Sequence, residues 1–251
     1  MNQNYSSQPA EPAYPPVPRR AVFRPYVTYA LIGVCIALFL LQMLSQLLFS
    51  GTDWPFILGG KINEYILAGE LWRLFTPMFL HGSILHIAFN MYALFNFGPS
   101  LELHYGRWRF LGLFILSGFA GNVISFMFSP NPSLGSSTAI FGLLGAEGVF
   151  LYHNRSLFGD FARRALTQVV MIAGVNLLIG MSPGIDNWGH IGGLIGGTLF
   201  AWFAGPVLHR EGFYPPYRLV DQREQRDVIL AGSGVALLFV ILVVAVFVMR
   251  G

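Results

Sequence analysis

The sequence predicts an all-α protein that crosses a membrane several times. Of its 251 residues, 54% are hydrophobic and only 11% are charged, whereas about a quarter are charged in an average soluble domain. Seven apolar runs, separated by polar gaps, approach the ~20 residues that a helix needs to cross a bilayer. The six histidines have no zinc-binding spacing and Cys35 is the single cysteine, so we expect no disulfide, no metal and no other cofactor.

The seven runs divide the chain into a core and an appended helix. They cover residues 26–49, 84–103, 108–128, 136–152, 165–181, 188–208 and 228–249, and the fourth and fifth are short. Residues 1–24 are rich in proline and lack an apolar run, which predicts a disordered tail. Residues 209–227 mix both charges and predict a solvated linker. Six helices in residues 25–208 would then form the core, with one more helix in residues 228–251.

Basic residues collect in alternate gaps between the runs. With the N-terminus in the cytoplasm, the inner segments hold twelve Lys and Arg, and the outer segments hold three, Lys61, Arg73 and Arg250. Because basic residues favour cytoplasmic loops, we expect a cell-membrane protein with its N-terminus and residues 153–164 in the cytoplasm. The net charge of +3 then reflects topology, and no nucleic-acid partner is expected.

One stretch, from Gly135 to Ala146, joins a polar turn to an apolar helix with regularly spaced glycines. Its Ser137 lies near the outer end of the fourth run, and His190 lies at the outer end of the sixth. A serine and a histidine at matching depth can act as nucleophile and general base. Serine is also an ordinary helix cap and a small packing residue in membrane helices.

Two further polar residues lie at the same level of the membrane. His86 and Asn90 are four residues apart in the second run, so they share one helix face. Two donors on one face can stabilise an oxyanion, or they can hold two helices together. Polar side chains at membrane depth usually face a bundle interior or a water-filled cavity. We therefore expect one cavity that opens toward the outer face.

Taken together, these residues resemble the rhomboid family of intramembrane serine proteases. The resemblance lies in an ordered set of short motifs between residues 71 and 205. They are Trp72-Arg73, His81-x4-His86-x3-Asn90, Glu102-x3-Gly106, Gly135-x-Ser137 and His190-x2-Gly193-x3-Gly197. The resemblance implies a rhomboid-like six-helix bundle, with a C-terminal seventh transmembrane helix that some members add.

The resemblance also implies a role for each matching residue. Ser137 would be the nucleophile and His190 the general base of a Ser-His dyad that hydrolyses peptide bonds in or near transmembrane segments. His86 and Asn90 would stabilise the oxyanion, with the backbone N–H of Ser137 as a third donor. Phe141, one turn below the serine, would pack against the catalytic imidazole.

Glycines are expected to bring the two dyad helices together. His190, Gly193 and Gly197 share one face at i, i+3 and i+7, and Gly142 and Gly145 thin the opposing helix. Small residues of this kind allow helix backbones to approach closely in membranes.

Three further residues lie near the expected dyad in the sequence. The family usually has glycine after the serine, but this chain has Thr138, whose branched side chain stiffens the turn and adds bulk. Ser136 is expected to cap the helix, which leaves Ser137 for the chemistry. Asp186, four residues before His190, is expected in the preceding loop rather than as a third member of the dyad.

Two other functions fit parts of the sequence. A small-solute transporter would also have glycine-interrupted helices, but it predicts internal repeats, and residues 26–128 do not correspond to residues 136–249. A catalytically inactive rhomboid-like protein that binds transmembrane helices would need no dyad, and this chain retains both dyad residues. The expected partners are transmembrane protein substrates and the lipid bilayer; the oligomeric state and the substrate stay open.

Overall fold

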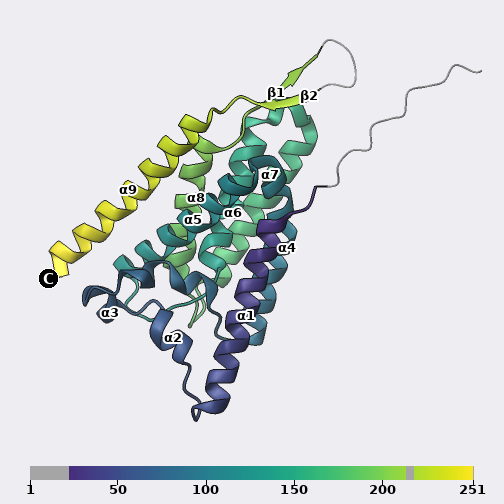
Figure 1. Cartoon of the computed structure of the whole chain (residues 1–251). Coiled ribbons are helices and arrows are strands. Elements are labelled where there is room, and N and C mark those ends of the chain that lie inside the picture. The colour runs from purple at the N-terminus through teal and green to yellow at the C-terminus, as the bar shows by residue number, and fades with distance from the viewer. Residues whose placement is uncertain (1–22, 213–217, 251) are drawn as a thin grey trace, which may run out of the picture.

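The computed structural model describes residues 23–212 and 218–250, so most of the proline-rich tail lies outside the described residues (Figure 1). Within these ranges the fold is a bundle of long helices. They are α1 (Tyr26–Leu48), α4 (Ile84–Tyr105), α5 (Arg107–Phe128), α6 (Ser137–His153), α7 (Arg155–Ile179), α8 (Asn187–Ala204) and α9 (Gln225–Arg250). Each of the seven expected runs corresponds to one of these helices, as a multi-pass membrane protein requires.

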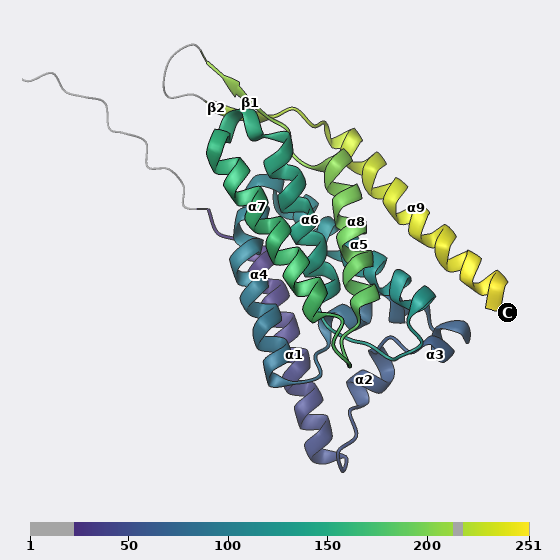
Figure 2. The same ribbon diagram turned by 180° about the vertical axis from the view of Figure 1, so that it is seen from behind.

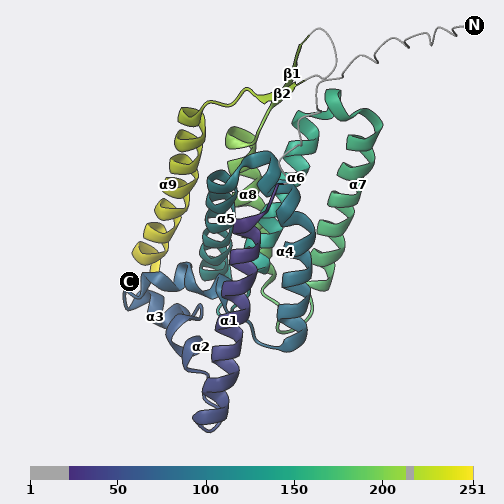
Figure 3. The ribbon, with the colours of Figure 1, turned by 45° about the vertical axis from the view of Figure 1, so that its right-hand side comes forward.

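Three helices form the centre of the bundle. α5, α6 and α8 each pack against the other two, and α6 is buried along almost its whole length. α4 and α7 cover further sides of α6, α1 lies against α4, and α9 runs along α5 and α8 at the edge of the bundle (Figures 2 and 3). The short α6 is therefore shielded by its neighbours.

Hydropathy divides the long helices into two groups. In the described part of the chain, α1, α5, α7 and α9 are each long and apolar enough to cross a membrane. The other three are the helices on which the sequence places its candidate site: α4 with His86 and Asn90, α6 with Ser137, and α8 with His190. Polar residues inside a membrane usually face protein or water, and these helices lie against the interior of the bundle.

A buried carboxylate joins the first two long helices. Glu102 of α4 accepts hydrogen bonds from the backbone N–H of Val27 at 3.0 Å and of Thr28 at 2.8 Å, and from the Thr28 hydroxyl at 2.8 Å. These are free N–H groups at the start of α1, where a negative charge is favourable. Gly98 leaves room for Thr28, because a Cβ there would meet its side chain. The carboxylate thus sets the position of α1 on α4.

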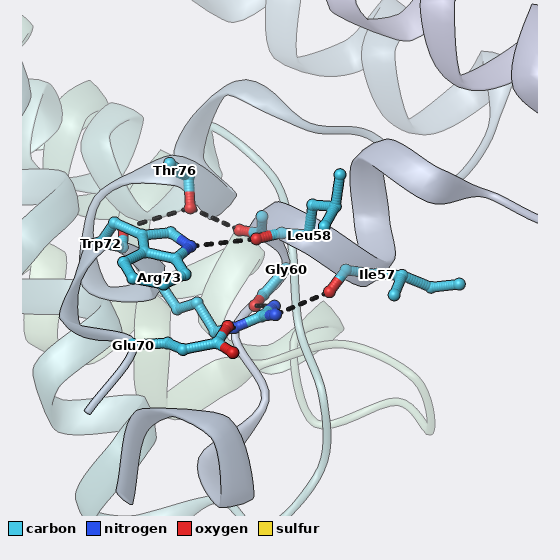
Figure 4. Close-up of polar contacts among 8 residues, drawn as sticks. Ile57, Leu58, Gly60, Glu70, Trp72, Arg73 and Thr76 are labelled. Carbon is cyan, nitrogen blue, oxygen red and sulfur yellow. Dashed lines mark hydrogen bonds and ion pairs between the residues drawn. The ribbon is translucent and has the colours of Figure 1, made fainter. Parts of the chain in front are cut away.

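The long loop between α1 and α4 is folded. It contains α2 (Trp54–Gly59), α3 (Asn63–Leu67) and two 3-10 turns, η1 (Leu71–Leu74) and η2 (Thr76–Phe79). The buried Arg73 donates to the carbonyls of Gly60 at 2.9 Å and Ile57 at 2.7 Å and pairs with Glu70 at 2.7 Å (Figure 4). Residues of the motif Trp72-Arg73 therefore hold this loop together.

Two helix boundaries differ clearly from the sequence prediction. Residues 155–164, expected as a loop, form the first turns of α7, with a kink at Gly159, whose φ is 53°. Hydropathy detects only the apolar part of such a helix. α8 ends at Ala204 rather than at residue 208, because Gly205 and Pro206 follow it and proline cannot continue a helix.

The expected linker contains a two-stranded antiparallel sheet. β1 (Leu208–Glu211) pairs with β2 (Arg218–Asp221), with Leu208 opposite Asp221. Arg109 at the start of α5 forms an ion pair with Asp221 at 2.7 Å. The segment before α9 is thereby attached to the bundle.

Candidate active site

The Ser137 and His190 side chains meet at the ends of two packed helices. Ser137 is the first residue of α6, and His190 lies in the first turn of α8. Their Oγ and Nε2 atoms are 2.9 Å apart, within hydrogen-bonding distance. The residues are 53 positions apart in the sequence, and this geometry is what a hydroxyl and its general base require.

The imidazole of His190 is held by an aromatic ring and by its own helix. Phe141 stacks on it, with ring centroids 4.4 Å apart and an interplanar angle of 14°. Within the described residues, Nδ1 of His190 has no hydrogen-bond partner. Asp186 is the N-cap of α8: its carboxylate accepts from the Gly189 N–H at 3.0 Å and contacts the Ser125 hydroxyl. It therefore orients the helix rather than the imidazole, and the arrangement is a pair.

The adjacent Ser136 has a different partner. It occupies the N-cap position of α6, but its side chain makes no capping hydrogen bond, so that expectation is wrong. Its hydroxyl lies 3.2 Å from Nε2 of His81, and both residues are buried. Burial lowers the pKa of His81 to about 3, and the neighbouring His86 contributes. His81 is therefore neutral at physiological pH.

Gly135 and the two α4 residues complete the site beside the serine. Gly135 has φ of +132°, which favours glycine, and a Cβ there would lie 2.6 Å from Nε2 of His86 and 3.6 Å from the Ser137 hydroxyl. His86 and Ser137 thus face the same small space. Asn90 donates one amide N–H to the His86 carbonyl at 3.0 Å, which leaves its second N–H for another acceptor.

The glycines of α6 and α8 lie where the two backbones touch. A Cβ on Gly193 would overlap the carbonyl of Thr138, and one on Gly197 would overlap the backbone of Gly142. Gly145 faces the side chain of Thr198 in the same way. Any side chain at these positions would push the helices apart, and the Ser137–His190 distance would increase with them.

Thr138 fits because two glycines face it. A Cβ on Gly121 of α5 would lie 2.6 Å from the Cβ of Thr138, and one on Gly189 of α8 would lie 3.0 Å from its Cγ2. Its hydroxyl is buried and has no hydrogen-bond partner within residues 23–212 and 218–250. The branched side chain thus packs between neighbouring helices rather than over the serine.

A cavity of about 820 Å³ adjoins the pair. Its lining includes Ser137, His190, His86, Asn90 and Phe141, together with residues of α7 and of the segment 129–135. These five residues of α4, α6 and α8 thus share one cavity, and residues of α7 form part of its wall. In the described part of the chain, no three His, Cys, Asp or Glu side chains are grouped as they would be to hold a metal ion.

A buried lysine holds the wall of this cavity, a role that was not predicted from the sequence. Lys61 donates from Nζ to the carbonyls of Ser129 at 2.8 Å and Asn131 at 2.9 Å, and its backbone pairs with Ser133. Asn63 also donates to the Ser129 carbonyl, at 2.9 Å. Burial lowers the pKa of Lys61 to about 8. The one signal in the sequence was that Lys61 is among the three basic residues expected on the outer side of the membrane.

A match to a protein-family model shows the family to which the chain belongs. The model of the rhomboid domain matches residues 68–207, more than half of the chain. The chain belongs to the rhomboid family. This family includes serine intramembrane proteases, and the matched residues contain α4 to α8 with the candidate active site.

Curated rhomboid proteins are similar over the same region. The chain is 42% identical over 179 residues to the rhomboid protease GluP of Bacillus subtilis. The aligned region covers 71% of this chain and 34% of that protein. It is 39% identical over 155 residues to the chloroplastic RHOMBOID-like protein 9 of Arabidopsis thaliana, 61% of this chain and 36% of that protein. The chain thus spans about a third of the length of these relatives.

Proposed function

We propose that this rhomboid protein is an intramembrane serine endopeptidase that cleaves membrane proteins in or near their transmembrane segments. The observation that carries the proposal is the 2.9 Å contact between Ser137 Oγ and His190 Nε2 beside the cavity. The Phe141 ring supports it, because stacking fixes the plane of the imidazole. The family membership supports the class of reaction.

In the proposed reaction, His190 carries its proton on Nδ1 and accepts the serine proton at Nε2. Ser137 Oγ attacks the carbonyl carbon of the substrate, and the negative charge that develops on the carbonyl oxygen is met by His86, Asn90 and the Ser137 N–H. His190 then gives the proton to the leaving amine, and an acyl-enzyme forms. A water molecule, deprotonated by the same imidazole, hydrolyses the acyl-enzyme and restores the serine.

Access to the site sets the expected substrate. The cavity adjoins α7 and the segment before α6, at the same end of the bundle as the folded loop of residues 49–83. With the N-terminus in the cytoplasm, this end is the outer one. We propose that the substrate helix unwinds near its outer end to present an extended peptide bond to the serine.

The test uses the full chain, purified and reconstituted with single-span model substrates. We expect cleavage by the unaltered protein and none by Ser137→Ala, and a fluorophosphonate adduct on Ser137 by mass spectrometry. Ser136→Ala is the matched control, because its hydroxyl contacts His81 and not His190; it should keep much of the activity. An adduct on Ser136, or cleavage by Ser137→Ala, would refute the assignment.

A further inference from the structure

A second, shallower groove lies between α8 and α9, away from the candidate active site. Its volume is about 450 Å³, and its apolar walls include Leu199 and Phe203 of α8. The residues that α9 contributes are Asp227, Leu230, Ala231, Gly234, Val235 and Leu238. These follow the spacing of one helix face, so the groove runs along α9.

The groove has the length of an acyl chain in one leaflet. From Asp227 to Leu238 is eleven residues, about 16 Å at 1.5 Å per residue, and half of a bilayer core is about 15 Å. The space over Gly234 is open, because a Cβ there would meet no atom within 4 Å. Leu230 and Phe203 are largely exposed, which leaves apolar surface for a hydrocarbon chain to cover.

Two opposite charges lie at the same end of the groove without pairing. Arg223 donates from Nη2 to the carbonyl of Trp202 at 3.0 Å, and its Nε–H is buried and has no partner in the described residues. The side chain of Asp227, four residues on, forms no hydrogen bond or ion pair within those residues. The guanidinium of Arg223 and the carboxylate of Asp227 thus both line the groove at the end of its apolar surface, and neither forms an ion pair in the described residues.

We propose that this groove binds a phospholipid whose headgroup carries a primary ammonium, as phosphatidylethanolamine does. One acyl chain lies along Gly234 and Leu238, the phosphate accepts from Arg223, and the ammonium donates to Asp227. Such a headgroup complements both charges, whereas an anionic headgroup leaves the carboxylate unpaired and repelled. A choline headgroup has the charge but no N–H to donate. The proposal does not depend on proteolysis.

The experiment is native mass spectrometry of the full chain with phosphatidylethanolamine, phosphatidylcholine and phosphatidylglycerol of identical acyl chains. We expect the ethanolamine lipid to be retained about tenfold better than the choline lipid, the order expected from one charge-assisted hydrogen bond. Asp227→Asn should remove that difference. Gly234→Phe should weaken retention of the ethanolamine lipid by filling the groove. Leu237→Phe, at an exposed position outside the groove, should bind as the unaltered protein does.

Thermal denaturation of each variant separates lipid binding from folding. Gly234→Phe should unfold near the temperature of Leu237→Phe in detergent alone, and it should gain less stability when phosphatidylethanolamine is added. Equal retention of the ethanolamine and choline lipids by the unaltered protein would overturn the proposal. Tighter retention of phosphatidylglycerol would also overturn it, because it would mean that Arg223 alone selects the lipid. Unchanged lipid binding by Gly234→Phe would overturn it as well.

Discussion

Asn90 and Asn96 lie on the same helix and make the same local contact, but only one of them lines the cavity. Each donates its amide to the carbonyl four residues earlier, Asn90 to His86 at 3.0 Å and Asn96 to Tyr92 at 2.7 Å. Asn96 is exposed on the outside of α4 and is absent from the cavity lining. A comparison of the two residues therefore tests the proposed catalytic role of Asn90 against a structural one.

We expect Asn90→Ala and His86→Ala each to slow cleavage by about 10²–10³, the typical cost of losing an oxyanion donor. Asn96→Ala should cleave at the normal rate. Turnover of a model substrate measures this, and far-UV circular dichroism checks that each variant is folded. Equal rates for Asn90→Ala and Asn96→Ala would return Asn90 to a structural role.

Thr138 is the residue at which this chain departs from the usual family pattern. Its hydroxyl is buried without a partner in the described residues, and such a group costs stability, whereas its methyl packs against two glycine positions. We expect Thr138→Val to unfold at the same temperature or higher, and Thr138→Gly to unfold at a lower one. Thermal denaturation in detergent decides this. A clear loss of stability in Thr138→Val would mean that the hydroxyl is hydrogen-bonded.

His81 makes the folded protein sensitive to acid. Because burial lowers its pKa from 6.5 to about 3, the unfolded chain binds a proton between these values and the folded chain does not. Stability is therefore lost as the pH falls from about 6.5 toward 3. Thermal denaturation at pH 7 and pH 5 should show a smaller loss for His81→Gln than for the unaltered protein. An identical loss in both would show that His81 does not contribute.

At the scale of the helices, the contact between α6 and α8 controls the site. Gly193→Val should separate them, because its side chain would overlap the carbonyl of Thr138, and both activity and thermal stability should fall. Gly112→Val is the control, since a Cβ on Gly112 of α5 meets nothing within 4 Å. If Gly193→Val were as active and stable as Gly112→Val, the close approach of these helices would be disproved.

The sequence allowed good predictions for contacts within one helix. The i, i+4 spacing of His86 and Asn90 and the i, i+3, i+7 spacing of His190, Gly193 and Gly197 followed from helix geometry alone. Contacts across the chain could not be found in this way. The Lys61 bonds to segment 129–135 join residues 68 and 70 positions apart, and periodicity carries no information on such pairs.

Helix boundaries were also predicted poorly from the sequence, again for a physical reason. The segment from Arg155 is helical up to a kink at Gly159 and again beyond it, and hydropathy does not detect polar helical turns of this kind. The ordered motifs predicted the family correctly. The roles of Ser137, His190, His86 and Asn90, and the domain boundaries derived from composition, stay predictions.

At the scale of the whole molecule, the exceptional basic residues have structural partners. Lys61, Arg73 and Arg250, the three expected on the outer side, all donate to backbone carbonyls. Arg250 at the end of α9 reaches the carbonyls of Phe126 and Met127 at 3.2 and 2.7 Å. Cations are favourable at a helix C-terminus, so this residue holds α9 to the end of α5. The departures from the basic asymmetry thus have structural causes.

The orientation in the membrane that this asymmetry predicts can be measured directly. The start of α1 and the β1–β2 sheet lie at one end of the bundle, and α2, α3 and the C-terminal end of α9 lie at the other (Figure 1). The native Cys35 is buried, so single cysteines can be introduced at exposed positions. Ser182, between α7 and α8, and Arg163, in the first half of α7, are both exposed.

We expect an impermeant thiol reagent to label Ser182→Cys on intact cells and to label Arg163→Cys only after the membrane is permeabilised. The reason is that twelve basic residues would otherwise lie on the outer side of the membrane and only three on the inner side. Labelling of Arg163→Cys on intact cells, with protection of Ser182→Cys, would show that the protein has the opposite orientation in the membrane. The cavity beside Ser137 would then open toward the cytoplasm, and the substrate would be cut near the inner end of its helix.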